Sequence, residues 1–169
     1  MTKSVYLAGP GVFHPAAKAL FEYLVEVCDK AGLKGVTPEI GALDLSALDS
    51  AGKAAAIRRL NVEKIQAVDA VIACISPFRG PGADAGTAWE MGYAEALGKP
   101  VVAWCEDTAD YLSRVPSDAD EEGKVWCRQH GMIVENFGLV DNLMLTAGEH
   151  PVQPDFDAAV ALAKVLVGE

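Results

Sequence analysis

The run of residues 70–75, AVIACI, constrains the fold more than any other segment of the chain. It is continuously apolar and contains β-branched residues, whereas a strand with one face in water alternates apolar and polar residues. Such a run predicts a strand that is covered on both faces. Strands of this kind occur in parallel sheets with helices on either side, so the rest of the chain should supply those helices.

Strand-like and helix-like segments alternate along the chain. Besides residues 70–75, the predicted strands cover residues 4–8, 34–37 and 100–104. The predicted helices lie between Pro15 and Gly32 and over residues 54–67, 87–97 and 156–167. Residues 39–52, 106–120 and 133–145 are expected to be loops. This alternation indicates an α/β fold with a parallel sheet, formed by residues 1–169 as a single domain.

Charge and composition exclude several classes of function. The net charge of -10 argues against a sequence-independent grip on nucleic acid and against binding to an anionic membrane surface. The four cysteines lack CxxC spacing and the three histidines form no i,i+4 pair, so we expect reduced thiols and no bound metal. The N-terminal apolar run is too short for a signal peptide, and no segment reaches transmembrane length. A cytoplasmic protein is therefore expected.

Two loops follow the carboxyl ends of predicted strands, residues 9–15 and 76–84. Ligands of parallel α/β sheets bind at this edge, so these loops should form the walls of a site. Neither loop carries a GxGxxG or P-loop motif, and the chain has no GxSxG motif. Dinucleotide, triphosphate and serine-nucleophile chemistry are therefore poorly supported, and no cofactor is expected.

The turn and helix over residues 84–93 carry two carboxylates, Asp84 and Glu90. One interpretation is structural: Thr87-x-x-Glu90 has the form of a capping box, and Asp84 can cap a helix. The other is catalytic, because a carboxylate held ionised near a helix N-terminus can attack an anomeric carbon. Tyr6 is either a core aromatic or the donor that orients such a carboxylate. Asn61 is either a solvated helix residue or a ligand contact.

Taken together, several segments resemble the nucleoside 2-deoxyribosyltransferase family. The matching segments, in order, are VYLAGP at 5–10 with Phe13 behind it, Asn61, DAVIA at 69–73, SPFRG at 76–80, DAGTAWEMGYA at 84–94, GKPV at 98–101 and GLVDNLML at 138–145. They span residues 4–146. Each segment alone is a weak signal, but the ordered set is specific.

The resemblance implies a flavodoxin-like (Rossmann-like), five-stranded parallel sheet flanked by helices. It implies a nucleophile at Glu90, an acid at Asp84 that assists proton transfer to the leaving base, and at Tyr6 a hydrogen-bond partner of the nucleophile. It implies a homo-oligomer, based on dimers, in which Asn142 of a neighbouring subunit holds the sugar 5′-hydroxyl. The residues expected to bind substrate are Gly9, Phe13, Asn61, Phe78, Gly86, Asn142 and Met144.

Two departures from the family bear on substrate. Some members have aspartate where Asn61 stands, and an amide cannot carry a proton to the base. Related hydrolases of deoxynucleoside monophosphates carry serine and arginine in the first loop, whereas residues 9–15 contain neither, which favours a free 5′-hydroxyl.

The expected reaction is transfer of 2-deoxyribose between purine and pyrimidine bases in nucleotide salvage, by double displacement through a covalent glutamyl-deoxyribosyl intermediate. Hydrolysis of the N-glycosidic bond by the same nucleophile is one alternative. A non-catalytic nucleoside-binding module is another. The expected partners are small deoxynucleosides and free nucleobases.

Overall fold

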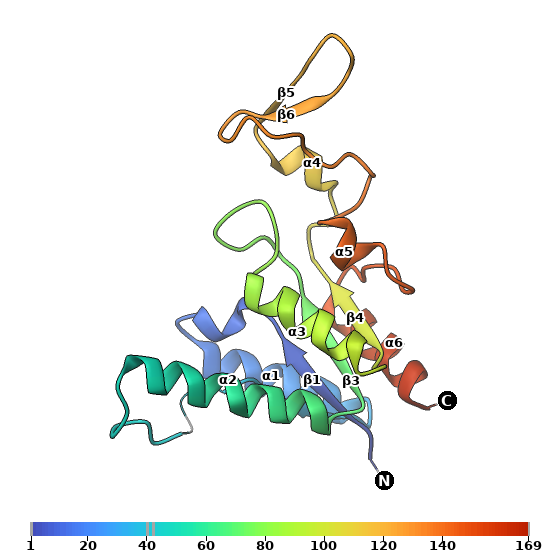
Figure 1. Cartoon of the computed structure of the whole chain (residues 1–169). Helices are drawn as coiled ribbons and strands as arrows, with labels where there is room; N and C mark the ends of the chain where they lie inside the picture. The colour runs from blue at the N-terminus through green and yellow to red at the C-terminus, as the bar shows by residue number, and fades with distance from the viewer. Residues whose placement is uncertain (1, 40, 42, 169) are drawn as a thin grey trace.

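The computed structural model of the chain describes residues 2–39, 41 and 43–168. Its centre is a parallel sheet with the strand order β2-β1-β3-β4 (Figure 1). The strands are β1 (Ser4–Ala8), β2 (Lys34–Val36), β3 (Ala70–Cys74) and β4 (Val101–Trp104). Each pairs in parallel with its neighbours. The α/β fold and the four strands expected from the sequence are therefore confirmed.

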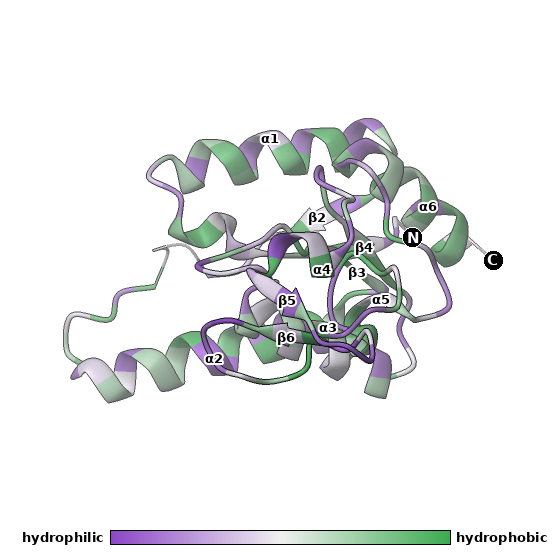
Figure 2. Cartoon of the chain, turned by 90° about the horizontal axis from the view of Figure 1, so that it is seen from above, coloured by the Kyte–Doolittle hydropathy of each residue, from purple (hydrophilic) through white to green (hydrophobic). Residues whose placement is uncertain are grey.

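Helices cover both faces of the sheet, as the view from above shows (Figure 2). α1 (Ala17–Lys30) and α6 (Phe156–Gly168) lie on one face, and α2 (Ser50–Ala67) and α3 (Ala85–Ala96) lie on the other. A 3-10 turn over Pro10–Phe13 follows β1. α2 and α3 begin earlier than predicted because Asp49 and Asp84, respectively, accept hydrogen bonds from their first turns.

Side chains of the central strands alternate between two apolar cores, as expected for a period of two residues. Val5, Leu7 and Ile72 pack into the core beneath α1 and α6. Tyr6 and Val71 point to the opposite face and pack into the core beneath α2 and α3. Tyr6 therefore lies on the same side of the sheet as the helix that carries Glu90.

A fifth strand was expected beside β4, and its place is taken by a single parallel bridge between Trp104 and Gln153. Gln153 N donates to Ala103 O at 2.8 Å, and Cys105 N donates to Gln153 O at 3.0 Å. Pro151 and Pro154 flank this segment, and proline cannot donate to a ladder, which limits the pairing. The sheet thus has four strands and one bridged edge residue in the part of the chain that the structure describes.

The region after β4 contains α4 (Tyr111–Arg114) and an antiparallel hairpin of β5 (Ser117–Ala119) and β6 (Val125–Cys127). α5 (Leu143–Thr146) follows within residues 133–145 and extends one residue beyond them. Residues 106–120 and 133–145 were expected to be loops, and this expectation is wrong for α4, β5 and α5, whereas β6 lies in a stretch for which no element was predicted. The hairpin extends away from the carboxyl edge of the sheet (Figure 1). The predicted loop over residues 39–52 includes residues 40 and 42, which lie outside the described residues.

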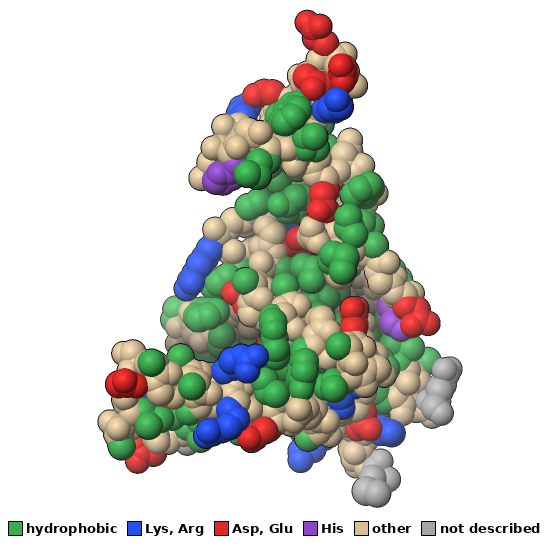
Figure 3. Space-filling model, viewed as in Figure 1, with side chains coloured by type: hydrophobic (Ala, Val, Ile, Leu, Met, Phe, Trp, Pro, Cys, Tyr) green, Lys and Arg blue, Asp and Glu red, His purple; other side chains and the backbone are tan. Residues whose placement is uncertain are grey.

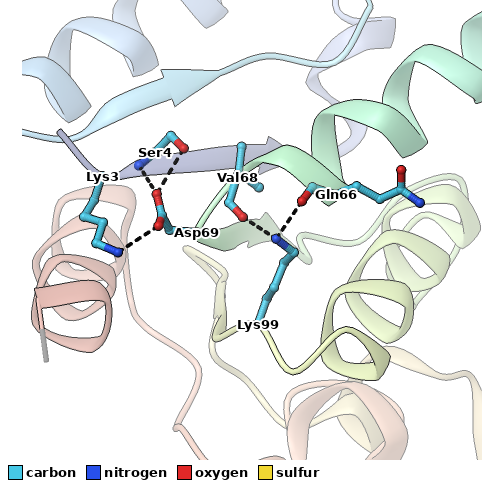
Figure 4. Close-up of polar contacts among 6 residues, drawn as sticks. All are labelled: Lys3, Ser4, Gln66, Val68, Asp69 and Lys99. Carbon is cyan, nitrogen blue, oxygen red and sulfur yellow. Dashed lines mark hydrogen bonds and ion pairs between the residues drawn. The ribbon is translucent and has the colours of Figure 1, made fainter. Parts of the chain in front are cut away.

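Polar contacts hold the amino edge of the sheet together (Figure 4). Asp69 Oδ2 accepts from Ser4 N at 2.8 Å, and Asp69 Oδ1 accepts from Lys3 Nζ at 2.9 Å. Lys99 Nζ donates to the carbonyls of Gln66 and Val68, where α2 ends. These contacts lie at the edge opposite the loops that follow β1 and β3, so they stabilise the fold without entering that region.

All four cysteines, Cys28, Cys74, Cys105 and Cys127, are free thiols, in agreement with the prediction of reduced cysteines. Burial raises the pKa of the Cys28 thiol to about 11. Among the described residues, no helix combines the length and apolar character needed to cross a bilayer.

Candidate active site

A hydrogen bond joins the first strand to the third helix. Tyr6 is fully buried on β1, and its hydroxyl donates to Glu90 Oε1 on α3 at 2.7 Å. Burial, the charge of Glu90 and this hydrogen bond all raise the pKa of Tyr6, so the phenol keeps its proton and acts as the donor. The other carboxylate oxygen, Oε2, accepts no hydrogen bond among the described residues.

The surroundings of Glu90 favour its protonated form. Burial raises the pKa of the carboxyl from 4.5 to about 7, and the nearby charge of Asp84 raises it as well. The Tyr6 hydroxyl acts in the opposite direction. The sequence suggested a carboxylate kept ionised by the helix N-terminus, but Glu90 lies in the second turn of α3, beyond the free N–H groups of the first turn. It is poised between its two forms near neutral pH.

Asp84 caps α3 and lies next to this pair. Its Oδ2 accepts from Thr87 N at 3.1 Å and from Thr87 Oγ1 at 3.3 Å. The capping box suggested by Thr87 and Glu90 is therefore replaced by a cap from Asp84, which leaves Glu90 available to Tyr6. A Cβ at Gly86 would lie 2.9 Å from Asp84 Oδ2, so glycine at this position gives the carboxylate its room.

Aromatic side chains join the two loops at the carboxyl edge. Phe13 and Phe78 stack with ring centroids 5.1 Å apart, and the Arg79 guanidinium lies 4.6 Å from the Phe78 ring. Arg79 also has a positive φ of 57°, an uncommon backbone conformation for a residue with a side chain. Gly9 lies close to β3, where an added Cβ would come within 2.8 Å of Cys74 Cβ. The two loops thus contact each other at the carboxyl edge of the sheet.

Asn61 is half-buried on α2, and its Oδ1 accepts from Glu39 N at 2.9 Å. Lys64, one turn further along, donates to Thr37 O at 3.0 Å. The amide of Asn61 therefore holds the segment after β2 against α2. The sequence did not predict this contact.

Asn142 and Met144 lie away from Glu90 in their own chain. Together with Ala88 and Gly92 they line an open groove of about 540 Å³ along α3. Ala88 and Gly92 are turned roughly 160° around the helix axis from Glu90. Met144 is 77% exposed, and Figure 3 shows hydrophobic side chains along the face that carries α3 and α5. The structure therefore brings Tyr6, Asp84 and Glu90 together and leaves Asn142 and Met144 on another surface.

Asp141 was not singled out from the sequence, although it is one of few buried acidic side chains, with 4% exposed. Its Oδ2 accepts from Ala83 N at 2.8 Å, and its Oδ1 accepts from Asn142 N at 2.7 Å. It thus ties the loop that ends at Asp84 to the segment that begins α5. The only sequence signal was an acidic residue inside the apolar run 139–145, which also fits a surface loop.

Within the described residues, no three His, Cys, Asp or Glu side chains gather as a metal site would require. The chemistry available at the site is that of two carboxyl groups, a phenol and the donors of a helix N-terminus. A half-ionised, buried carboxyl group with a second carboxylate beside it is suited to nucleophilic attack coupled to proton transfer.

The chain matches one family model and two solved structures over most of its length. The model of the family described as nucleoside 2-deoxyribosyltransferase matches residues 5–144. The structure of a 2-desoxiribosyltransferase from Leishmania mexicana is similar with a TM-score of 0.76 and 35% identity, over 96% of this chain and 97% of that chain. A 2-deoxyribosyltransferase from Bacillus psychrosaccharolyticus has a TM-score of 0.58 at 23% identity, over 91% and 88% of the two chains, which shows a shared fold.

A curated relative from Schizosaccharomyces pombe, described as an uncharacterized protein, is 39% identical over 115 residues. The match covers 67% of this chain and 54% of the relative. This chain therefore spans about half the length of the relative it matches.

Proposed function

The chain belongs to the nucleoside 2-deoxyribosyltransferase family, and we propose that it transfers 2-deoxyribose between purine and pyrimidine bases. The observation that supports this activity most directly is the hydrogen bond from Tyr6 to Glu90 Oε1, with Asp84 beside it. It provides a fixed nucleophile and a neighbouring acid–base group at the carboxyl edge of a parallel sheet, where ligands of such folds bind.

The proposed reaction is a double displacement. Glu90 attacks C1′ of the deoxynucleoside as the bond from C1′ to the base nitrogen breaks, and Asp84 delivers a proton to the departing base directly or through water. A second base then attacks C1′ of the glutamyl ester through a ring nitrogen, Asp84 takes up the proton of that nitrogen directly or through water, and Glu90 leaves as a carboxylate. Two inversions give net retention. No organic cofactor or metal takes part in this scheme.

The hydrogen bond from Tyr6 determines which oxygen attacks. Oε1 is occupied by the phenol, whereas Oε2 has no partner among the described residues, so Oε2 is the nucleophilic atom. The Tyr6 donor stabilises the ionised form of Glu90 and later the carboxylate that leaves the ester. A 2′-hydroxyl would withdraw electrons from C1′ and destabilise the oxocarbenium-like transition state, which favours 2′-deoxy substrates.

The residues that would contact the substrate come mainly from the two loops at the carboxyl edge of the sheet. Phe13 and Phe78 offer a stacked aromatic wall. Gly9 and Gly86 have no side chain, so a substrate could approach their backbone closely. We also propose that Asn61 lies near the base, together with the segment after β2 that its amide holds against α2. The nucleoside would then lie above β1 and β3, between the first loop and the start of α3.

Asn142 and Met144 are proposed to act in the site of a neighbouring subunit. In support, both lie on the outer side of α3 in their own chain, on a surface with exposed apolar side chains. Pairing of two such surfaces would give a dimer-based homo-oligomer in which each subunit completes the other's site. The Asn142 amide would then meet the sugar 5′-hydroxyl.

Two further assignments follow from the family. The bridge at Gln153 stands where a fifth parallel strand would pair with β4, which supports the order 2-1-3-4-5 of flavodoxin-like sheets. The four free thiols support a reducing compartment, and we place the protein in the cytoplasm, in salvage of bases and deoxynucleosides.

A product assay tests the proposal. The protein is incubated with deoxyinosine, with and without free adenine or cytosine, and the products are separated by chromatography. A new deoxynucleoside that forms only with the added base supports transfer. Release of hypoxanthine and deoxyribose that is insensitive to added base would make the enzyme a hydrolase, and no product with any donor would contradict both activities.

The variant Glu90→Ala identifies the nucleophile in the same assay. It should lose transfer while its circular dichroism spectrum stays that of the wild type. Glu63→Ala, an exposed glutamate on α2, is the matched control and should retain transfer. Substantial transfer by Glu90→Ala would remove Glu90 from this role.

A further inference from the structure

The side chain of Asn142 is fixed by two partners of opposite character. Its Oδ1 accepts from Met144 N at 3.0 Å, which caps α5. Its Nδ2 donates to Glu135 Oε1. An amide turned by 180° would place Nδ2 against the Met144 N–H and Oδ1 against the carboxylate, so both contacts select the same orientation.

Glu135 binds this segment with both of its oxygens. Besides the Asn142 amide on Oε1, it accepts from Leu143 N on Oε2 at 3.0 Å. Asp141 accepts from Asn142 N at 2.7 Å on the neighbouring side. Three N–H groups of two successive residues therefore go to two carboxylates. Every partner that Glu135 contacts here is a donor, and only a carboxylate accepts on both oxygens.

These contacts limit which part of the Asn142 amide can bind a ligand. Oδ1 of Asn142 faces α5, where it accepts from Met144 N, and one Nδ2–H donates to Glu135. The second Nδ2–H has no partner within the described part of the chain. Asn142 thus offers a hydrogen-bond donor outward while its acceptor faces its own helix.

We propose that Glu135 is a positioning residue that fixes Asn142 as a donor, so that the site it completes selects sugars with an acceptor oxygen at the 5′ position. This inference rests on the proposed function, because it takes Asn142 to meet the 5′-hydroxyl. It adds that the 5′ oxygen receives the hydrogen bond and that selection depends on a residue seven positions before Asn142.

The variant Glu135→Gln tests the inference because it keeps the size of the side chain. Glutamine has one acceptor and one donor group, whereas both partners donate, so one contact must become a clash between donors. The measurement is kcat/KM for a 2′-deoxynucleoside and for its 5′-deoxy counterpart, with the same acceptor base. The wild-type protein should prefer the 5′-hydroxyl donor by about tenfold, the value of one ordinary hydrogen bond.

In Glu135→Gln this preference should fall to about one, with the loss in kcat/KM confined to the 5′-hydroxyl donor. Glu121→Gln, an exposed glutamate at the hairpin tip, is the matched control and should keep the wild-type preference. An unchanged preference in Glu135→Gln overturns the inference. An equal loss on both donors also overturns it, because that is the result of a structural role alone.

The double variant Asn142→Asp with Glu135→Gln separates stability from recognition. The carboxylate introduced at position 142 can accept from Met144 N and from the amide introduced at position 135. The oxygen of that amide can accept from Leu143 N, so the thermal midpoint should return toward that of the wild type. No side-chain N–H remains at position 142, so the 5′ preference should stay lost.

Recovery of the preference in the double variant would overturn the inference. Absence of transfer by the wild-type protein with either donor would instead contradict the proposed function.

Discussion

The phenol of Tyr6 and the carboxyl of Glu90 are 84 residues apart in the chain and meet across 2.7 Å between β1 and α3. Tyr6 is immobilised in the sheet, with no exposed surface, whereas Glu90 lies half-buried at the sheet's helical face. The strand therefore orients a carboxyl group that the helix alone would leave free to rotate. Of the contacts to Glu90, this hydrogen bond is the one that favours its charged form.

Removal of the phenolic hydroxyl should shift the pH dependence of the reaction. The hydrogen bond from Tyr6 lowers the pKa of Glu90, so Tyr6→Phe should raise it above its value of about 7. The acid limb of the kcat/KM profile should move to higher pH, and the rate at pH 7 should fall roughly tenfold or more, as expected for loss of a hydrogen bond to a charged group. An acid limb that does not move would show that Tyr6 does not tune the nucleophile.

Glu90 should also make the stability of the protein depend on pH. Its pKa is 4.5 in the unfolded chain and about 7 in the folded protein, so the folded state binds this proton more tightly. Its contribution is present in full below pH 4.5 and is lost as the pH rises through 7.

Glu90→Gln should therefore match the wild type at pH 5 and exceed its free energy of unfolding at pH 8, by on the order of 2 kcal/mol. Urea denaturation at both pH values measures this difference. A Glu90→Gln variant that is less stable than the wild type at pH 8 would contradict the assigned pKa.

A methyl group at position 86 should displace the acid without unfolding the protein. Its Cβ would lie 2.9 Å from Asp84 Oδ2, so the carboxylate must move from the Thr87 N–H in Gly86→Ala. We expect kcat to fall about tenfold or more, because catalytic groups act only when correctly placed. Gly168→Ala, at an open position near the end of α6, is the matched control and should keep full activity. Full activity in Gly86→Ala would show that Asp84 tolerates the shift or takes no part.

Contacts at the amino edge of the sheet should affect stability alone. Asp69 accepts from Ser4 N and Lys3 Nζ, and these contacts hold the pKa of its carboxyl below the usual range (Figure 4). Asp69→Asn should lower the free energy of unfolding by about 1 kcal/mol at pH 7. The difference should shrink as the pH falls through the carboxyl's lowered pKa, because the wild type then loses the same charge. A change in kcat/KM at a temperature where both proteins are fully folded would contradict the separation of this edge from the site.

The sequence predicted the strands and helices because their signals are local. The apolar run 70–75 indicated a doubly covered strand, and Gly32 and Gly98 marked where helices end. The region after Cys105 was predicted less well. Its hairpin and short helices are held by turns and by single contacts, such as the hydrogen bond from Trp126 Nε1 to Asp120. No periodic sequence pattern predicts them.

The candidate site was likewise predicted only in part from the sequence. The sequence alone shows which chemical groups are available: a tyrosine on the first strand, and Asp84 and Glu90 around the start of one helix. Their behaviour depends on the folded protein, because burial raises the pKa of Glu90 while the hydrogen bond from Tyr6, 84 residues away in the chain, lowers it. The same holds for Asn142, whose donor is turned outward by Glu135 and by its own helix cap. The sequence states the residue type, whereas the protonation state and the hydrogen-bond direction of a side chain depend on its neighbours in the folded protein.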